Sequence, residues 1–286
     1  GIFTNLSHDH LDYHKTFAKY RDVKKKFFDE LSSEAFALVN VDDKNGSVML
    51  QNTKAKKHTY ALKQYADYKT QILENQFGGL LLKVDDNEVW TRLIGNFNAY
   101  NVLSIYATAE LLGLEKVEIL RLISDLESVS GRFQYVVSDE KITAIIDYAH
   151  TPDALKNVLE TINSIRTKNE ELITVVGCGG DRDKTKRPKM GHIASALSTK
   201  VIFTSDNPRS EKPEDVLSDI ESGVEPQNFK KTLTIEDRKQ AIKAACQIAQ
   251  PNDIILIAGK GHETYQEIKG ERFDFDDLKI VKEFLK

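Results

Sequence analysis

Arginines, carboxylates and glycines recur in three short polar stretches of the second half of the chain. The charged residues singled out as a candidate site are Arg182 in "GCGGDRDKTKR" (177–187), Asp206 and Arg209 in "SDNPR" (205–209), and Glu263 in "AGKGHE" (258–263). An arginine can bind a carboxylate through two parallel hydrogen bonds, and a carboxylate can accept from an ammonium. Two cations and two anions together suit a zwitterion, such as an amino acid with carboxylate and amine ends.

Each stretch follows an apolar run that reads as a strand, and so does a fourth polar stretch, "DYAH" (147–150). The carboxyl ends of strands in an open parallel sheet lie along one edge, where ligands bind. We therefore expect the four loops to share one rim, which also includes Gly259, Lys260 and His262. The alternative is a set of solvated loops with incidental ion pairs. One loop alone would favour that alternative, whereas four loops in the same position favour a site.

The stretch "SHDHLDYH" (7–14) gathers histidines and aspartates near the start of the chain. His and carboxylate side chains together suit a divalent metal, and Mg²⁺ prefers oxygen ligands. A hydrogen-bonded turn that opens the next helix explains the same residues equally well.

A lysine occupies an apolar helix face in the next segment, residues 15–31. The helical spacing sets Lys24 among Phe17, Tyr20, Phe27, Phe28 and Leu31, with Lys25 and Lys26 pointing elsewhere. Partial burial would lower the pKa of its amine, and a neutral amine can react with carbon dioxide to give a carbamate, an oxygen ligand for a metal. The residues alone favour the alternative, in which the ammonium reaches past the rings to water.

Two amides and one arginine complete the candidates. Asn98 and Asn101 in "GNFNAYN" (95–101) lie three residues apart at a helix start, where helix capping is the default role and contact with a purine or a loop is the functional one. Arg132 in "SVSGRF" (128–133) lies at the best candidate for a hinge. It is either a surface arginine or one that reaches a phosphate.

Composition sets limits on the partners. The 286 residues are 40% apolar and 29% charged, with a formal net charge of -4, which leaves room for about two domains and shows no nucleic-acid footprint. The apolar runs are too short to span a bilayer, and no secretory leader is visible. Cys178 and Cys246 form no C-x-x-C motif, which favours a reduced, cytoplasmic compartment.

The two halves of the chain have different element patterns. The first half reads as a helix (15–31), strands (35–41 and 57–62), a hairpin of alternating runs on either side of residues 85–86, and helices (98–114 and 116–126). The second half alternates strands (142–147, 172–177, 201–205, 253–259) with helices (151–166, 188–198, 213–223, 237–249). This alternation predicts an α/β, doubly wound, mostly parallel Rossmann-like sheet.

The order of these motifs resembles that of the Mur ligases. The resemblance rests on "TNLSHDHLDYH", the helix with Lys24, "GNFNAYN", "GRF", "DYAHTPDAL", "GCGGDRDKTKRPKMG", "SDNPR" and "AGKGHE", and it covers essentially the whole chain. The D-N-P-R turn resembles the members that add meso-diaminopimelate, whereas members that add lysine depart at the arginine. The resemblance implies ATP-driven amide ligation with Mg²⁺, in which meso-diaminopimelate joins UDP-N-acetylmuramoyl-L-alanyl-D-glutamate. Together with the composition, we expect a cytoplasmic monomer with no nucleic-acid or membrane partner.

The resemblance also implies a role for each matching residue. Lys24 aligns with the lysine that is carbamylated in the family and His10 with a magnesium ligand, which overturns the preference for an exposed ammonium at Lys24. The implied ATP-binding positions are Asn98, Asn101, Arg132, Asp147 and His150. The implied amino-acid positions are Arg182, Asp206, Asn207, Pro208, Arg209, Gly259 and Glu263.

Two departures from the family pattern limit these expectations. His8 stands where many members have arginine, and the chain has no G-K-[ST] phosphate loop, since "AGKGHE" does not fit that pattern. We therefore expect the C-terminal portion of a three-domain enzyme: residues 1–130 from a partial central ATPase domain with antiparallel strands, and residues 131–286 from the domain that binds the incoming amino acid. The alternatives are a sibling Mur or polyglutamate-type ligase that adds L-lysine or another amino acid, and a non-catalytic amino-acid-binding fragment.

Overall fold

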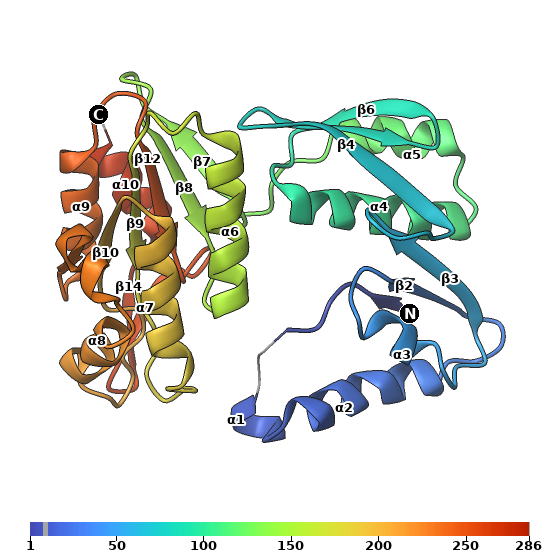
Figure 1. Ribbon diagram of the computed structural model, residues 1–286, viewed down its shortest axis with the longest axis horizontal. Coiled ribbons are helices and arrows are strands. Elements are labelled where there is room, and N and C mark those ends of the chain that lie inside the picture. Colours follow the sequence, from blue (N-terminus) through green and yellow to red (C-terminus); the bar gives the residue numbers. More distant parts are fainter. Residues whose placement is uncertain (8–10, 286) are drawn as a thin grey trace. The chain divides into compact units, whose positions relative to one another are not determined.

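The computed structural model describes residues 1–7 and 11–285 and divides into two compact units, Gly1–Glu127 and Ser128–Lys286 (Figure 1). Each unit has its own six-stranded sheet and its own helices. The sequence-based boundary between residues 130 and 131 stays a prediction. Within the described residues, no helix is both long and apolar enough to cross a membrane.

The sheet of the first unit is parallel at one end and antiparallel at the other. Its order is β1-β2-β3-β4-β5-β6, with parallel pairing from β1 to β4 and antiparallel pairing from β4 to β6. The strands are β1 (Ile2–Phe3), β2 (Phe36–Asn40), β3 (Lys56–Ala61), β4 (Tyr68–Gln76), β5 (Gly79–Val84) and β6 (Asn87–Thr91). The predicted hairpin is confirmed at β5–β6. Its two turn residues, Asp85 and Asp86, have φ angles of 45° and 65°, the left-handed values that a tight hairpin turn requires. Strand β4 was not predicted, because its alternation is weak.

The helices of this unit are α1 (Leu11–His14), α2 (Phe17–Asp29), α3 (Gly46–Met49), α4 (Asn96–Leu111) and α5 (Lys116–Ser124). Helices α4 and α5 pack on the strands through a buried cluster that includes Leu82, Val102, Tyr106 and Ile119. Helix α2 buries only Tyr20 and Phe28. The predicted helices at 15–31, 98–114 and 116–126 are therefore confirmed to within a few residues at each end.

The second unit confirms the doubly wound, mostly parallel sheet. Its order is β11-β10-β9-β12-β8-β7, and only β7 is antiparallel to its neighbour. The strands are β7 (Gln134–Val137), β8 (Thr143–Asp147), β9 (Leu172–Val176), β10 (Lys200–Phe203), β11 (Thr232–Thr234) and β12 (Ile254–Ala258). The helices are α6 (Pro152–Ile165), α7 (Lys186–Leu197), α8 (Pro213–Glu221), the 3₁₀ helix η1 (Pro226–Lys231), α9 (Arg238–Ile248) and α10 (Asp277–Phe284).

Both faces of this sheet are covered. On one face, α9 and α10 pack through Ile242 and Val281 against Ile173 and Ile255 of the central strands. Neighbouring strand residues such as Leu256 point to the opposite face and are also fully buried. This burial on both faces explains why the strands read as continuous apolar runs.

A short antiparallel hairpin, β13 (Tyr265–Ile268) and β14 (Glu271–Asp274), follows the loop after β12. Its turn residues, Lys269 and Gly270, have φ angles of 52° and 83°. The sequence pattern does not predict this hairpin. None of the eight strand residues is buried, so the usual apolar alternation is missing.

Candidate functional site

The polar loops that follow β8, β9, β10 and β12 come together, as the sheet topology requires. The backbone amide of Gly180 donates to the carbonyl of Asn207 (2.8 Å), and the amide of Gly259 donates to the carbonyl of Asp147 (3.0 Å). A Cβ atom on Gly180 would lie 1.9 Å from the Pro208 carbonyl oxygen, so only glycine allows these loops to approach so closely. The loops therefore form the continuous rim that their positions in the sequence predict.

Gly259 makes a similar approach with a side chain. Its φ of 118° is in the left-handed region, and a Cβ atom there would lie 2.8 Å from Oδ2 of Asp206. A larger residue would be strained in its backbone and would push against this carboxylate.

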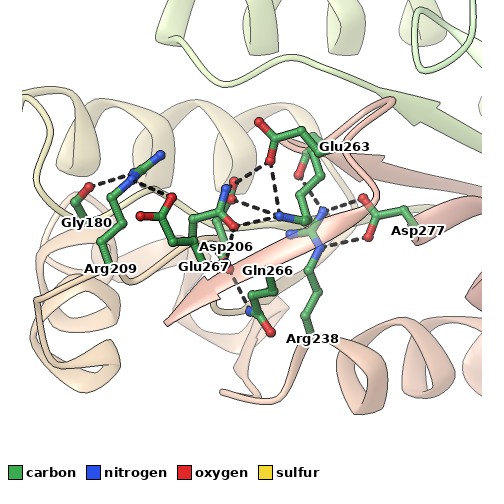
Figure 2. Close-up of polar contacts among 11 residues, drawn as sticks. Gly180, Asp206, Arg209, Arg238, Glu263, Gln266, Glu267 and Asp277 are labelled. Atoms are coloured by element: carbon green, nitrogen blue, oxygen red, sulfur yellow. Dashed lines mark hydrogen bonds and ion pairs between the residues drawn. The ribbon is translucent and has the colours of Figure 1, made fainter. Parts of the chain in front are cut away.

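A wholly buried lysine lies at the centre of the rim. The Lys260 ammonium is 2.9 Å from Oδ1 of Asn207, 3.2 Å from Oε2 of Glu263 and 3.7 Å from Oδ1 of Asp206. Figure 2 shows Asp206 and Glu263 directed towards the same position from the two loops. A buried ammonium needs such partners, because an unpaired charge away from water is costly. Lys260 therefore joins the loop after β10 to the loop after β12.

The Asn207 side chain is held in one orientation. Its Oδ1 accepts from the Lys260 ammonium and from the backbone amide of Glu267 (2.9 Å), and both of these groups can only donate. Its Nδ2 donates to Oε2 of Glu263 (2.9 Å). Asn207 and Lys260 both contact Oε2 of Glu263. The other carboxylate oxygen of Glu263, Oε1, makes none of the hydrogen bonds of this cluster and can accept from an ammonium.

Arg209 occupies an unusual backbone position. Its φ is 51°, a left-handed value that is uncommon outside glycine and costs about 1–2 kcal/mol for other residues. The side chain is mostly buried, and Nη1 donates to the carbonyl of Gly180 (2.8 Å) while Nε lies 3.5 Å from Oε2 of Glu267 (Figure 2). The guanidinium is therefore fixed at two of its three nitrogens.

The exposed Arg182 belongs to the loop after β9, and its Cγ lies near Arg209. A Cβ atom on Gly179 would lie 2.9 Å from Nη1 of Arg209 and 3.8 Å from Cγ of Arg182. The structure therefore brings together all seven residues predicted for the amino acid: Arg182, Asp206, Asn207, Pro208, Arg209, Gly259 and Glu263.

A second polar cluster surrounds Asp147 at the end of β8. Its carboxylate accepts from the backbone amide of Phe133 (2.7 Å), and burial raises the pKa of Asp147. The Arg132 guanidinium lies 4.8 Å from the Tyr148 ring centroid, and Nδ1 of His150 lies 2.9 Å from the Tyr148 carbonyl oxygen. Arg132, Asp147 and His150, which were predicted to contact ATP, are thus neighbours.

The other two predicted ATP contacts belong to the Gly1–Glu127 unit. Asn98 donates to the Ile94 carbonyl (2.8 Å), and Asn101 donates to Oδ1 of Asn98 (3.0 Å). Neither amide caps α4, whose N-cap is Gly95. The default capping role is therefore wrong for both.

The expectation that Lys24 is partly buried is wrong, and its exposure agrees with the alternative that the residues alone favoured, an ammonium that reaches water. Lys24 is exposed, with its ammonium 5.6 Å from the Tyr20 ring centroid, because α2 leaves Phe27 56% exposed and its apolar face is only partly covered. Lys25 is the more buried lysine, with 12% of its side chain exposed and an ion pair to Asp29. His10 lies outside the described residues, and so does His8.

Several residues that support the rim gave no signal in the sequence. Arg238 and Asp277 form a wholly buried ion pair (2.8 Å), and Arg238 also donates to the carbonyl of Ala258 (3.0 Å), directly before Gly259 (Figure 2). Gln266 and Glu267 contact the loop after β10 from the β13–β14 hairpin. Recognising any of them needed a three-dimensional structure, since their partners lie 20 or more residues away.

Comparison with known sequences gives the class of this protein. Residues 1–109 match the Mur ligase middle domain, and residues 131–261 match the Mur ligase, glutamate ligase domain. The chain belongs to the Mur ligase family, which confirms the resemblance of its motifs.

Individual relatives with curated names are more informative than the family models. A UDP-N-acetylmuramoyl-L-alanyl-D-glutamate–2,6-diaminopimelate ligase from Cytophaga hutchinsonii is 56% identical over 285 residues, which is 100% of this chain and 58% of the relative. The ligase of the same name from Halalkalibacterium halodurans is 41% identical over 293 residues, covering 100% of this chain and 59% of the relative. The chain thus spans less than two thirds of the length of these curated relatives.

Solved structures agree on the fold. A structure of a ligase with the same name is 38% identical, with a TM-score of 0.62, and covers 99% of this chain and 59% of that one. A MurF structure from Acinetobacter baumannii shares the fold at 12% identity, with a TM-score of 0.73 over 99% of this chain and 58% of the other.

Proposed function

We propose that the protein containing this chain is an ATP-dependent amide ligase that adds meso-diaminopimelate to UDP-N-acetylmuramoyl-L-alanyl-D-glutamate. The observation that carries the proposal is the Asp206–Arg209 turn with its fixed guanidinium and one carboxylate, held against a second carboxylate, Glu263, of the loop after β12. The named function of the relatives agrees with it. We also propose that the protein acts in the cytoplasm as a monomer, with no nucleic-acid or membrane partner.

The rim suits an amino acid that is charged at both ends. Arg209 and Arg182 would bind the distal carboxylate of diaminopimelate, while Glu263 and Asp206 would accept from its ammonium. Lysine has only an amine at that end, so it would leave the guanidinium fork unpaired. An unpaired buried donor of this kind costs about 1–3 kcal/mol or more, which is enough to separate the two amino acids.

The reaction proposed is transfer through an acyl phosphate. The dipeptide carboxylate attacks the γ-phosphate of ATP and ADP leaves, then the amine of diaminopimelate attacks the acyl carbon and phosphate leaves. The rim holds and orients the amino acid for the second step. Asn98, Asn101, Arg132, Asp147 and His150 are the proposed contacts to ATP.

A magnesium ion is a further part of the proposal. Within residues 1–7 and 11–285, no three His, Cys, Asp or Glu side chains are grouped to hold a metal ion, and the Lys24 side chain is exposed. The described residues thus do not by themselves fit a metal site. Binding of Mg²⁺ by His10 and a carbamylated Lys24 remains a proposal, and no step of the reaction is derived through it.

An ATPase assay tests the proposal. We expect this chain to hydrolyse no ATP, because it contains no G-K-[ST] loop. A fusion of the chain to the upstream part of the Cytophaga hutchinsonii relative should hydrolyse ATP when nucleotide-sugar dipeptide and meso-diaminopimelate are both present. An Arg209→Ala fusion should no longer increase its ATP hydrolysis when diaminopimelate is added. Turnover by the chain alone, or equal turnover of the fusion with L-lysine, would contradict the proposal.

A further inference from the structure

The β13–β14 hairpin clamps the turn that carries the proposed amino-acid contacts. The side-chain amide of Gln266 donates to the carbonyl of Asp206 (2.6 Å), and the backbone amide of Glu267 donates to Oδ1 of Asn207 (2.9 Å). The backbone amide of Arg209 donates to the carbonyl of Glu267 (3.1 Å), and that of Lys269 donates to the carbonyl of Arg209 (2.7 Å).

This clamp explains how Arg209 keeps its strained backbone. A left-handed residue persists only where its surroundings determine it, and here both backbone groups of Arg209 bond to the hairpin. The backbone of Arg209, and with it the start of its side chain, is therefore held in place by the β13–β14 hairpin and not by its own loop alone.

One residue contacts the turn through both its backbone and its side chain. Glu267 bonds Asn207 and Arg209 through its backbone, and its carboxylate faces Nε of Arg209 at 3.5 Å. Because Gly180 accepts from Nη1, the guanidinium plane is anchored at both sides. The groups left for a ligand are Nη2 and the second hydrogen of Nη1, which together form an end-on fork for a carboxylate.

We propose that Glu267 is a positioning residue of the amino-acid site. Its carboxylate holds the Arg209 guanidinium in the orientation that binds the distal carboxylate of the amino acid, and does not itself touch the amino acid. This inference rests on the proposed function, because it requires that Arg209 binds a carboxylate.

A positioning role and a purely electrostatic role for Glu267 predict opposite changes in the affinity for diaminopimelate. A carboxylate beside Arg209 repels an incoming carboxylate, so removing it would strengthen the binding of diaminopimelate. A positioning role predicts weaker binding, because the free guanidinium must then be ordered when the ligand binds. The sign of the change in affinity therefore separates the two roles.

The test is calorimetric titration of the 286-residue chain with meso-diaminopimelate. Glu267→Ala keeps the backbone bonds of the clamp and should weaken binding on the order of tenfold. Glu267→Gln should stay within about threefold of the parent chain, because its amide oxygen can occupy the same place beside Nε of Arg209 and accept from it. Glu271→Ala removes the same charge from the exposed neighbouring strand of the hairpin and should leave affinity unchanged.

The outcomes distinguish the inference from the function on which it rests. Unchanged or tighter binding by Glu267→Ala, or equal loss with Glu267→Gln and Glu271→Ala, would overturn the positioning role while leaving the amino-acid site in place. If the parent chain binds no diaminopimelate, the proposed function fails and the inference fails with it. A thermal melt of each variant, with a midpoint close to that of the parent, shows that any loss is not unfolding.

Discussion

At the scale of single residues, the site depends on a lysine that sequence reasoning placed on the rim but not at its centre. Lys260 has no exposed side-chain surface and is bonded to Asn207 and Glu263. Its charge balances carboxylates that would otherwise repel each other. These contacts hold the Glu263 carboxylate in one orientation, in which Oε1 can accept from an ammonium.

Replacing this lysine should destabilise the fold. Lys260→Met removes one partner of a buried charged cluster and leaves Asp206 and Glu263 uncompensated, so we expect a loss of about 3–5 kcal/mol in the free energy of unfolding. Urea denaturation followed by circular dichroism measures it. The matched control is Lys279→Met at an exposed position, which should change stability by less than about 1 kcal/mol. Equal losses in the free energy of unfolding for the two substitutions would show that the Lys260 cluster does not stabilise the fold more than an exposed ion pair does.

At the scale of elements, another buried cation, Arg187, joins the loop after β10 to helices α7 and α8. Arg187, whose side chain is wholly buried, contacts Glu211 at 2.8 Å and Asp219 at 2.8 Å. Hydrogen bonds from Arg187 and then Lys184 lower the pKa of Glu211 to about 2. The loop that begins with the Asp206–Arg209 turn is therefore held at its far end as well.

This pKa shift predicts a pH dependence of stability. A carboxylate with a lowered pKa in the folded state contributes stability that is present above its unfolded pKa, near 4.5, and is lost as pH falls towards 2. Glu211→Gln should lower the unfolding free energy at pH 7 by about 1–3 kcal/mol. The difference from the parent chain should shrink between pH 4.5 and 2. Urea denaturation midpoints of the two proteins across this pH range measure the difference. A difference that stays constant with pH would contradict the lowered pKa of Glu211. The control is Glu214→Gln at an exposed position.

The elements also show what the sequence could and could not predict. The strands β8, β9, β10 and β12 were predictable because burial on both faces makes them continuous apolar runs, and their polar ends located the rim. The β13–β14 hairpin was not predictable, because its partly exposed residues are held by contacts to a turn some 60 residues away. Lys24 was misplaced because helical spacing indicates a face but not whether anything covers it.

At the scale of the whole molecule, the two units hold different parts of the proposed chemistry. The Ser128–Lys286 unit contains the complete rim and the Asp147 cluster, whereas Asn98, Asn101 and Lys24 belong to Gly1–Glu127. All seven residues proposed to bind the amino acid therefore belong to one unit. The proposed binding of the amino acid can be measured without ATP.

The most direct test is a calorimetric comparison of meso-diaminopimelate with L-lysine on the 286-residue chain. The fixed Arg209 fork and the Glu263 carboxylate predict that diaminopimelate binds at least about tenfold more tightly, and that Arg209→Ala removes most of this preference. Exposed Arg121→Ala is the control and should keep it. Equal or tighter binding of lysine by the parent chain would contradict the account.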